Sequence, residues 1–274
     1  MKILKKVLYV FFLTVFILIF IFCSIYLVNY LKESKKSEAT VDELKQEIAE
    51  EDEEEYNEVT PEGEKTGYVD FDGVLVQKKY AKLYKKNQDF VGWIKIEDTE
   101  IDYPVVQSIY EEEYYLYRDF YKESSSAGTI FIDGSSDVKN GDNIILYGHN
   151  MQTGKMFHDL LKYEDEDFYK EHKYISVNTI YGDETYEVIG AFRTKIYEAD
   201  KQGFKYYQFF EAETESEYMD YVRNCNSLTP YQIEMTAKYG DKLLTLSTCA
   251  YHTKNGRYVV VAREVTEENK IDWE

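Results

Sequence analysis

Three residue types are scarce in this sequence of 274 residues, which holds 3 proline, 3 cysteine and 14 glycine residues. So few prolines and glycines leave little room for long flexible repeats, and no internal repeat is visible. Basic residues are also few, since 32 Lys and Arg stand against 52 Asp and Glu and give a formal net charge of −20. Proteins bind a phosphate backbone mainly through Lys and Arg. The deficit argues against a nucleic-acid-binding protein, and an anionic membrane surface should also repel the chain as a whole.

Charge is missing altogether from residues 7–31, which read VLYVFFLTVFILIFIFCSIYLVNYL. This run is longer than the about 20 apolar residues that cross a hydrocarbon core. The alternative is a cleaved signal peptide, but its apolar region is usually about 7–15 residues and a small-residue cleavage site follows it. We therefore expect an uncleaved transmembrane anchor. Lysines at positions 2, 5 and 6 favour a cytoplasmic tail over residues 1–6, although those at positions 32, 35 and 36 weaken the bias.

Residues 32–66 contain 14 acidic and 5 basic side chains and almost no aromatic ones. Such a segment buries too little apolar surface to offset the entropy of ordering it. We expect an extracytoplasmic linker, either an extended tether or a solvated helix. The remaining residues, 67–274, carry enough apolar and aromatic side chains for one folded domain.

The domain is predicted to be mainly β-structure with helices. One helix is expected over residues 74–87, and an inserted helix over 211–225, before Pro230. Runs of strand composition occupy residues 93–96, 102–107, 128–133, 143–148, 173–177 and 185–192, and the last two strands occupy 242–249 and 256–264. Many short strands separated by polar turns indicate a closed barrel or a sandwich.

The last two strands bring a cysteine and an arginine together. Cys249 ends the first, Arg257 begins the second, and seven residues with an Asn-Gly turn signal separate them. Antiparallel pairing places Cys249 opposite Arg257 and Ser247 opposite Val259, so the thiol and the guanidinium share one face. A permanent cation beside a thiol favours the thiolate and can stabilise an oxyanion. The alternative is a buried strand cysteine beside a surface arginine.

A cysteine nucleophile needs a proton donor for its leaving group, and histidine is the side chain best matched to neutral pH. His149 follows Gly148 at the end of a predicted strand, where a side chain can project over a barrel mouth. A structural or solvated histidine is the alternative. His252, three residues after Cys249, is a rival base. Arg263 is a rival to Arg257, but the strand register places it far from the thiol.

Several of these segments together resemble one family. The residues that carry the resemblance are QDFVGWIKIEDTEIDYPVVQ (88–107), GTIFID (128–133), YGHNMQTGKMF (147–157), TLSTC (245–249) and GRYVVVAR (256–263), with the inserted helix. Over residues 74–265 the chain resembles the sortases, membrane-anchored cysteine transpeptidases of Gram-positive bacteria. The inserted helix and the YPVVQ and GHNM segments favour class B.

The resemblance implies a closed eight-stranded sortase β-barrel, preceded by one transmembrane helix, with Cys249, His149 and Arg257 in its cleft. Cys249 would attack the Thr carbonyl of an LPXTG- or NPQTN-type C-terminal sorting signal and form a thioacyl-enzyme. His149 would protonate the departing amine, and Arg257 with nearby backbone N–H groups would hold the oxyanion. An amine of a peptidoglycan precursor or of a pilin would resolve the thioester. The expected partners are surface proteins bearing the signal, with the catalytic domain on the cell-wall side.

Three further residues are predicted to bind substrate. Ser247 shares the strand face of Cys249, Tyr207 precedes the inserted helix where class B relatives shape the substrate groove, and Leu116 could contact the apolar part of a sorting signal. Each has an alternative role in packing the barrel.

No metal or other cofactor is expected, because His158, His172 and His252 have no metal-binding spacing with Cys225 or Cys249. Pairing Cys225 with Cys249 would consume the nucleophile, so both are expected to be reduced, with Cys225 buried. Two other functions stay open: a membrane-tethered cysteine hydrolase, and a non-catalytic barrel that binds cell-wall peptides.

Overall fold

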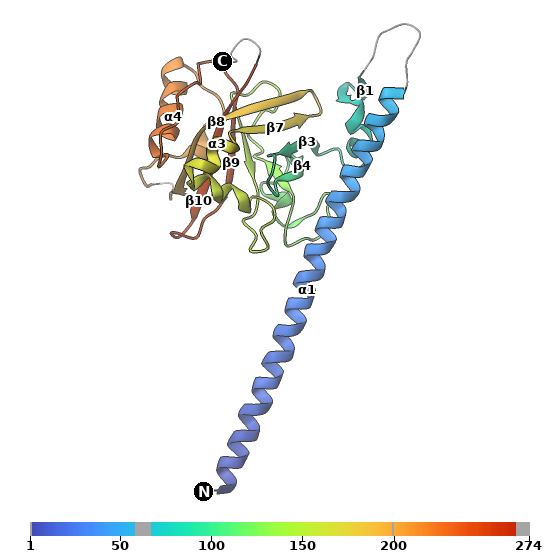
Figure 1. The fold of residues 1–274 in the computed structure, drawn as a ribbon, viewed down its shortest axis with the longest axis vertical. Coiled ribbons are helices and arrows are strands. Elements are labelled where there is room, and N and C mark those ends of the chain that lie inside the picture. The colour runs from blue at the N-terminus through green and yellow to red at the C-terminus, as the bar shows by residue number, and fades with distance from the viewer. Residues whose placement is uncertain (1, 58–66, 199, 267–274) are drawn as a thin grey trace.

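A long helix leads into a barrel in the computed structural model, which describes residues 2–57, 67–198 and 200–266 (Figure 1). Helix α1 spans Lys2–Asn57, and its N-terminal half extends away from the rest of the molecule. The elements that follow are β1 (Tyr68–Phe71), β2 (Val74–Gln77), η1 (Lys78–Tyr80), α2 (Ala81–Lys86), β3 (Phe90–Lys95), β4 (Asp102–Val106), η2 (Tyr114–Tyr117), β5 (Ile130–Ile132), β6 (Asn143–Tyr147), η3 (His158–Glu164), α3 (Glu166–Glu171), β7 (Tyr174–Thr179), β8 (Asp183–Lys195), η4 (Tyr206–Gln208), α4 (Glu215–Leu228), β9 (Leu243–Cys249) and β10 (Gly256–Glu264).

Eight of the strands close a barrel in the order β10-β8-β7-β3-β4-β5-β6-β9. Neighbouring strands are antiparallel except for β4 with β5 and β6 with β9, which are parallel. The closed eight-stranded barrel that the family resemblance implied is confirmed, and the sandwich that the strand pattern left open is not formed. The parallel pairing of β6 with β9 places the ends of these two strands at the same edge of the barrel, which is the edge that carries the candidate site.

Residues of β9 and β10 alternate between two hydrophobic clusters. Leu244, Leu246 and Val260 belong to the barrel interior, whereas Val259 and Val261 pack on the outside against α4. Helix α4 begins where the Thr214 hydroxyl accepts a hydrogen bond from the Glu217 amide at 3.3 Å. The inserted helix is therefore present, a few residues later than the predicted 211–225. Cys249 and Arg257 share the outer face with Val259, so the candidate site lies on the α4 side of the sheet.

The helix predicted over residues 74–87 is wrong in its first part. Residues 74–77 form β2, which pairs with β1 in a hairpin. Asp72 and Gly73 connect the two strands with φ of 52° and 92°, as a two-residue Asp-Gly hairpin turn requires. This turn signal outweighs the apolar spacing that favoured a helix, and helical structure begins only at η1 and α2.

The predicted anchor and residues 32–57 of the predicted linker form one continuous helix, and residues 58–66 of that linker lie outside the described residues. Among the described residues, α1 is the single helix that is long and apolar enough to cross a membrane. Beyond residue 32 the same helix docks on the barrel domain, where Leu44 is fully buried. Its acidic side chains pair with lysines of the domain, including Glu51 with Lys82 at 2.6 Å and Glu47 with Lys86. The segment is thus helical but docked rather than solvated.

Candidate active site

The β9–β10 hairpin has the register that the sequence predicted. Cys249 is paired with Arg257 and Ser247 with Val259. The Ala250 amide donates to the Gly256 carbonyl at 3.0 Å, so the neighbouring Cys249–Arg257 pair is the non-hydrogen-bonded kind, in which the Cα atoms lie about 4.5 Å apart and side chains are closest. The half-buried thiol and guanidinium therefore start from adjacent points on one face.

Glycine is required where the hairpin loop closes. A Cβ atom on Gly256 would lie 2.0 Å from the Ala250 carbonyl oxygen. The backbones of Ala250 and Gly256 could not approach and hydrogen-bond with any larger residue at position 256. Closure of this loop is what brings Arg257 back beside Cys249.

His149 lies two residues beyond the end of β6, at the edge where β9 also ends. Tyr147 is paired with Ser247 in the parallel ladder. Two further hydrogen bonds extend the contact, from the Gly148 amide to the Ser247 carbonyl at 3.3 Å and from the Thr248 hydroxyl to the Gly148 carbonyl at 2.7 Å. The structure therefore places His149 and Cys249 at the ends of neighbouring strands.

The ring of His149 is oriented by a backbone carbonyl. Its Nε2 lies 2.8 Å from the Leu116 carbonyl oxygen. A carbonyl oxygen only accepts, so Nε2 carries a proton and Nδ1 is the nitrogen left for proton transfer. Gly128, with φ of 63°, packs directly against this carbonyl, because a Cβ there would lie 2.4 Å from the same oxygen. Leu116 thus reaches the site through its main chain, which no side-chain pattern could reveal.

Arg257 is available to bind an anion. Its Nη1 donates to the carbonyl of Gly256 at 3.1 Å, and no carboxylate of the described residues forms an ion pair with it. Burial raises the pKa of the nearby Tyr206 to about 12, although its hydrogen bond with Ser247 and the charge of Arg257 oppose the shift. That phenol is neutral at physiological pH. The Ala250 amide is engaged in the hairpin, so the guanidinium is the better-placed donor for an oxyanion at Cys249.

The three predicted substrate-binding residues lie around this site in different ways. Ser247 is only 1% exposed, and its hydroxyl lies 2.7 Å from the Tyr206 hydroxyl. Tyr207 is half-buried, and its hydroxyl accepts from the amide of Tyr197 at 3.2 Å. The side chain of Leu116 is half-buried and packs against a cluster of buried hydrophobic residues, whereas its carbonyl oxygen contacts His149. Direct contact of these side chains with a substrate stays a prediction.

The rival residues have other environments. Arg263 is buried opposite Leu243, and its Nη2 lies 2.8 Å from a carboxylate oxygen of Glu187. His252 is exposed in the hairpin loop. Cys225 is a free cysteine with no exposed surface, as predicted, and burial raises the pKa of its thiol. Within residues 2–57, 67–198 and 200–266, no group of three or more His, Cys, Asp or Glu side chains is placed to hold a metal ion.

Asn150 is a residue of the site that the sequence did not single out. Its Nδ2 donates to the Cys249 carbonyl at 2.8 Å, and its Oδ1 lies 2.7 Å from Nδ1 of His158. The side chain therefore continues the β6–β9 contact past the last backbone pair and fixes the peptide plane that follows Cys249. Nothing in the residue type signals this role, because the contact depends on how the two strand ends meet.

Replacing Asn150 with alanine should release the Cys249 carbonyl and lower kcat of the reaction at Cys249 by about tenfold to a hundredfold, the cost of a misplaced reacting group. KM should change little, since Asn150 acts through Cys249. An Asn140→Ala variant, altered in an exposed loop, is the control and should keep wild-type kinetics. Steady-state kinetics of both variants check the prediction, and an unchanged kcat for Asn150→Ala would contradict it.

Comparison with known proteins assigns the family. A family model described as a sortase domain matches residues 94–265. Sortase B of Listeria monocytogenes is 34% identical over 199 residues, which cover 70% of this chain and 76% of that protein. Sortase B of Staphylococcus aureus is 34% identical over 191 residues, covering 69% and 75% respectively. The solved S. aureus sortase B–substrate complex aligns with a TM-score of 0.70 and 28% identity over 86% of this chain and 99% of that chain.

These matches confirm the resemblance to class B and agree with the barrel and the inserted helix described above. The chain belongs to the sortase family and is a cysteine transpeptidase of class B.

Proposed function

We propose that this sortase cleaves an LPXTG- or NPQTN-like C-terminal sorting signal after Thr and transfers the protein to an amine of a peptidoglycan precursor or of a pilin. Cys249, His149 and Arg257 are the catalytic residues in this proposal. The observation that carries it is the pairing of Cys249 with Arg257, which has no carboxylate partner among the described residues. The neighbouring strand β6 ends beside this pair, two residues before His149. A solved relative, the S. aureus sortase B–substrate complex, supports a peptide-binding cleft of this kind.

In the first half-reaction the thiolate of Cys249 attacks the Thr carbonyl carbon, and the negative charge that forms on the carbonyl oxygen faces the Arg257 guanidinium. The protonated ring of His149 gives its Nδ1 proton to the departing amine as the C–N bond after the Thr carbonyl breaks. This leaves the neutral ring with its proton on Nε2, the form that the Leu116 carbonyl stabilises. The products are a thioester on Cys249 and the released C-terminal peptide.

In the second half-reaction an acceptor amine attacks the thioester and passes a proton to Nδ1 of His149. The C–S bond breaks, and Cys249 leaves as a thiolate beside Arg257. An amide joins the surface protein to its acceptor, and the enzyme returns to its starting ionisation state. The proton that His149 gives in the first half-reaction is thus returned by the acceptor amine in the second.

The proposal includes a single-pass membrane protein. The apolar N-terminal half of α1 would cross the membrane, with the N-terminus in the cytoplasm and the barrel on the cell-wall side. The docked half of α1 would then hold the barrel close to the bilayer, since no extended tether separates them in the described helix. Acceptors that are themselves attached to the membrane would be within reach.

Transfer and hydrolysis differ in what an added amine does. We expect triglycine, added to the enzyme with a panel of LPXTG- and NPQTN-type peptides, to convert the acid product into a triglycyl amide for the peptide that is the substrate. Mass spectrometry of the products measures the ratio. A product that stays the acid at all amine concentrations would indicate a cysteine hydrolase, and the absence of any cleavage across the panel would indicate a peptide-binding barrel.

A further inference from the structure

Residues 115–129, the Leu116 segment, form a loop that is closed by its own hydrogen bonds. The Thr129 amide donates to the Tyr115 carbonyl at 3.1 Å, and the Thr129 hydroxyl donates to the Arg118 carbonyl at 2.9 Å. The carbonyl that contacts His149 lies between these two acceptors in the sequence. The position of the Leu116 carbonyl therefore depends on the position of the whole segment.

Helix α1 packs directly on the Leu116 segment. Leu44 of α1 is fully buried and belongs to the same hydrophobic cluster as Phe120 of the segment. A gap of about 20 Å³ remains between the helix and the segment, and Leu44 and Gly128 both line it. Gly128 packs in turn against the Leu116 carbonyl. The helix that leads out of the predicted membrane anchor thus rests on the residue that supports this carbonyl.

Polar contacts join α1 to another part of the same segment. Lys36 Nζ lies 2.6 Å from a carboxylate oxygen of Glu123 and 3.7 Å from one of Asp119. The Ser126 hydroxyl donates to Glu33 at 2.7 Å. The Asp119 carboxylate is buried and also accepts from two backbone amides of the segment, at 2.9 and 3.0 Å. It therefore connects the contact with α1 to the internal structure of the segment.

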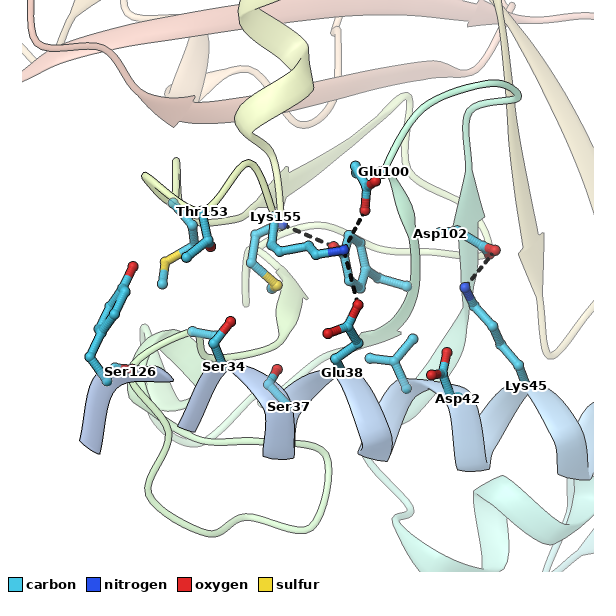
Figure 2. Close-up of a pocket in the computed structure, with 16 residues that line it drawn as sticks. Ser34, Ser37, Glu38, Asp42, Lys45, Glu100, Asp102, Ser126, Thr153 and Lys155 are labelled. Atoms are coloured by element: carbon cyan, nitrogen blue, oxygen red, sulfur yellow. Dashed lines mark hydrogen bonds and ion pairs between the residues drawn. The ribbon is translucent and has the colours of Figure 1, made fainter. Parts of the chain in front are cut away.

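The same part of α1 is fixed to the barrel by further ion pairs, which Figure 2 shows. Lys155 lies 3.2 Å from Glu38 of α1, and Lys45 of α1 lies 2.7 Å from Asp102, the first residue of β4. Lys155 belongs to the stretch of chain that follows His149. The helix therefore has a defined position on the barrel, from which it can hold the Leu116 segment in place.

We propose that the docked half of α1 is a positioning element of the active site, with Leu44 and Lys36 as its positioning residues. It holds the Leu116 carbonyl against His149, which keeps the proton of the neutral ring on Nε2 and leaves Nδ1 for the reaction. When α1 moves away, the carbonyl is released and the ring populates both tautomers. The inference rests on the proposed function for the role of His149, and it makes turnover depend on the docking of α1.

The test uses the full chain in lipid nanodiscs, with ¹⁵N in its histidine rings. The sequence has 4 histidines, and the ring signals that are missing from His149→Ala belong to His149. At about pH 9, where histidine rings are neutral, the nitrogen shifts report which nitrogen carries the proton. We expect the proton on Nε2 in the wild type and a mixture of tautomers in Leu44→Ala. This variant should also lose about tenfold in kcat, with an unchanged KM for the peptide.

A charge reversal at Lys36 tests the polar contact without opening a cavity. Lys36→Glu should also give mixed tautomers and lower kcat about two- to fivefold, which is what an exposed ion pair is worth. The double variant Lys36→Glu/Glu123→Lys should recover the wild-type tautomer and rate. Lys35→Glu makes the same change of charge at the preceding exposed position of α1, and it should match the wild type.

Gly128→Ala shows what a displaced carbonyl does to the ring of His149. The added Cβ would lie 2.4 Å from the Leu116 oxygen, so this variant should give mixed tautomers and lose about tenfold to a hundredfold in kcat. Gly240→Ala is its control. Gly240 also has a positive φ, of 97°, but no atom of the described residues lies within 4 Å of the added Cβ. Gly240→Ala therefore adds backbone strain alone and should keep the wild-type tautomer and rate.

The outcomes separate the inference from the proposed function. If Leu44→Ala and Lys36→Glu lose thermal stability but keep the wild-type tautomer, α1 only stabilises the fold and the positioning role is wrong. A wild-type ring with its proton on Nδ1 would overturn the inference as well. If the tautomer changes in these variants and kcat does not, α1 positions the ring but His149 is not the acid of the reaction. A wild type that transfers no peptide to an amine also counts against the proposed function alone, because the tautomers are measured without turnover.

Discussion

Replacing Cys249 with alanine is expected to lower kcat/KM for a sorting-signal peptide by at least about four orders of magnitude, because removal of a covalent nucleophile leaves only the rate that binding and the oxyanion site provide. The thiol is half-buried and ends β9, so its loss should leave the barrel intact. Binding of the peptide should persist. Product formation followed by mass spectrometry, with circular dichroism as the measure of folding, checks the prediction.

Cys225 provides a matched control for this variant. It is also a free cysteine, but it lies on the buried face of α4, and burial raises the pKa of its thiol. Cys225→Ala should leave kcat close to the wild-type value, with some loss of thermal stability from the small cavity that the missing sulfur leaves. Turnover retained by Cys249→Ala and lost by Cys225→Ala would reverse our assignment of the nucleophile.

Replacing His149 with alanine is expected to lower kcat/KM by about a hundredfold to ten-thousandfold, the usual contribution of a general acid and base. In the proposed mechanism the loss has a chemical cause, since the ring of His149 carries the proton to the leaving amine. Added imidazole should therefore restore part of the rate in His149→Ala. A purely structural role for His149 predicts no such rescue.

His252 is the control for this second variant. It is exposed in the loop between β9 and β10, close in sequence to Cys249. We expect His252→Ala to keep nearly normal kinetics. A near-normal rate in His149→Ala, together with a large loss in His252→Ala, would show that the loop histidine is the base.

The sequence predicted the parts of the site that depend on local pairing. The Asn-Gly loop and the alternation of β9 and β10 were enough to pair Cys249 with Arg257 and to place Arg263 opposite Leu243, as the structure has them. Strand periodicity has a fixed repeat, so a hairpin register follows once the loop is recognised. The sequence also predicted that His149 follows the end of a strand. It did not show that this strand, β6, pairs in parallel with β9, which places His149 and Cys249 at neighbouring strand ends.

The parts that the sequence could not predict depend on tertiary contacts made by groups without a distinctive pattern. The Leu116 carbonyl and the Asn150 amide reach His149 and Cys249 from segments that the fold brings together. The docking of helix α1 on the barrel also depends on tertiary contacts that the sequence does not show. Its acidic residues indicated a solvated segment, because the sequence does not show that Lys82 and Lys86 of the domain would lie opposite them.

Trapping of the acyl-enzyme tests the central claim most directly. The enzyme is mixed with its sorting-signal peptide without an amine, quenched in acid, digested and mapped by mass spectrometry. We predict that the peptide containing Cys249 gains the mass of the substrate up to its Thr, that hydroxylamine removes this mass, and that Cys249→Ala never acquires it. An adduct on another residue, or cleavage of the substrate by Cys249→Ala, would contradict the account.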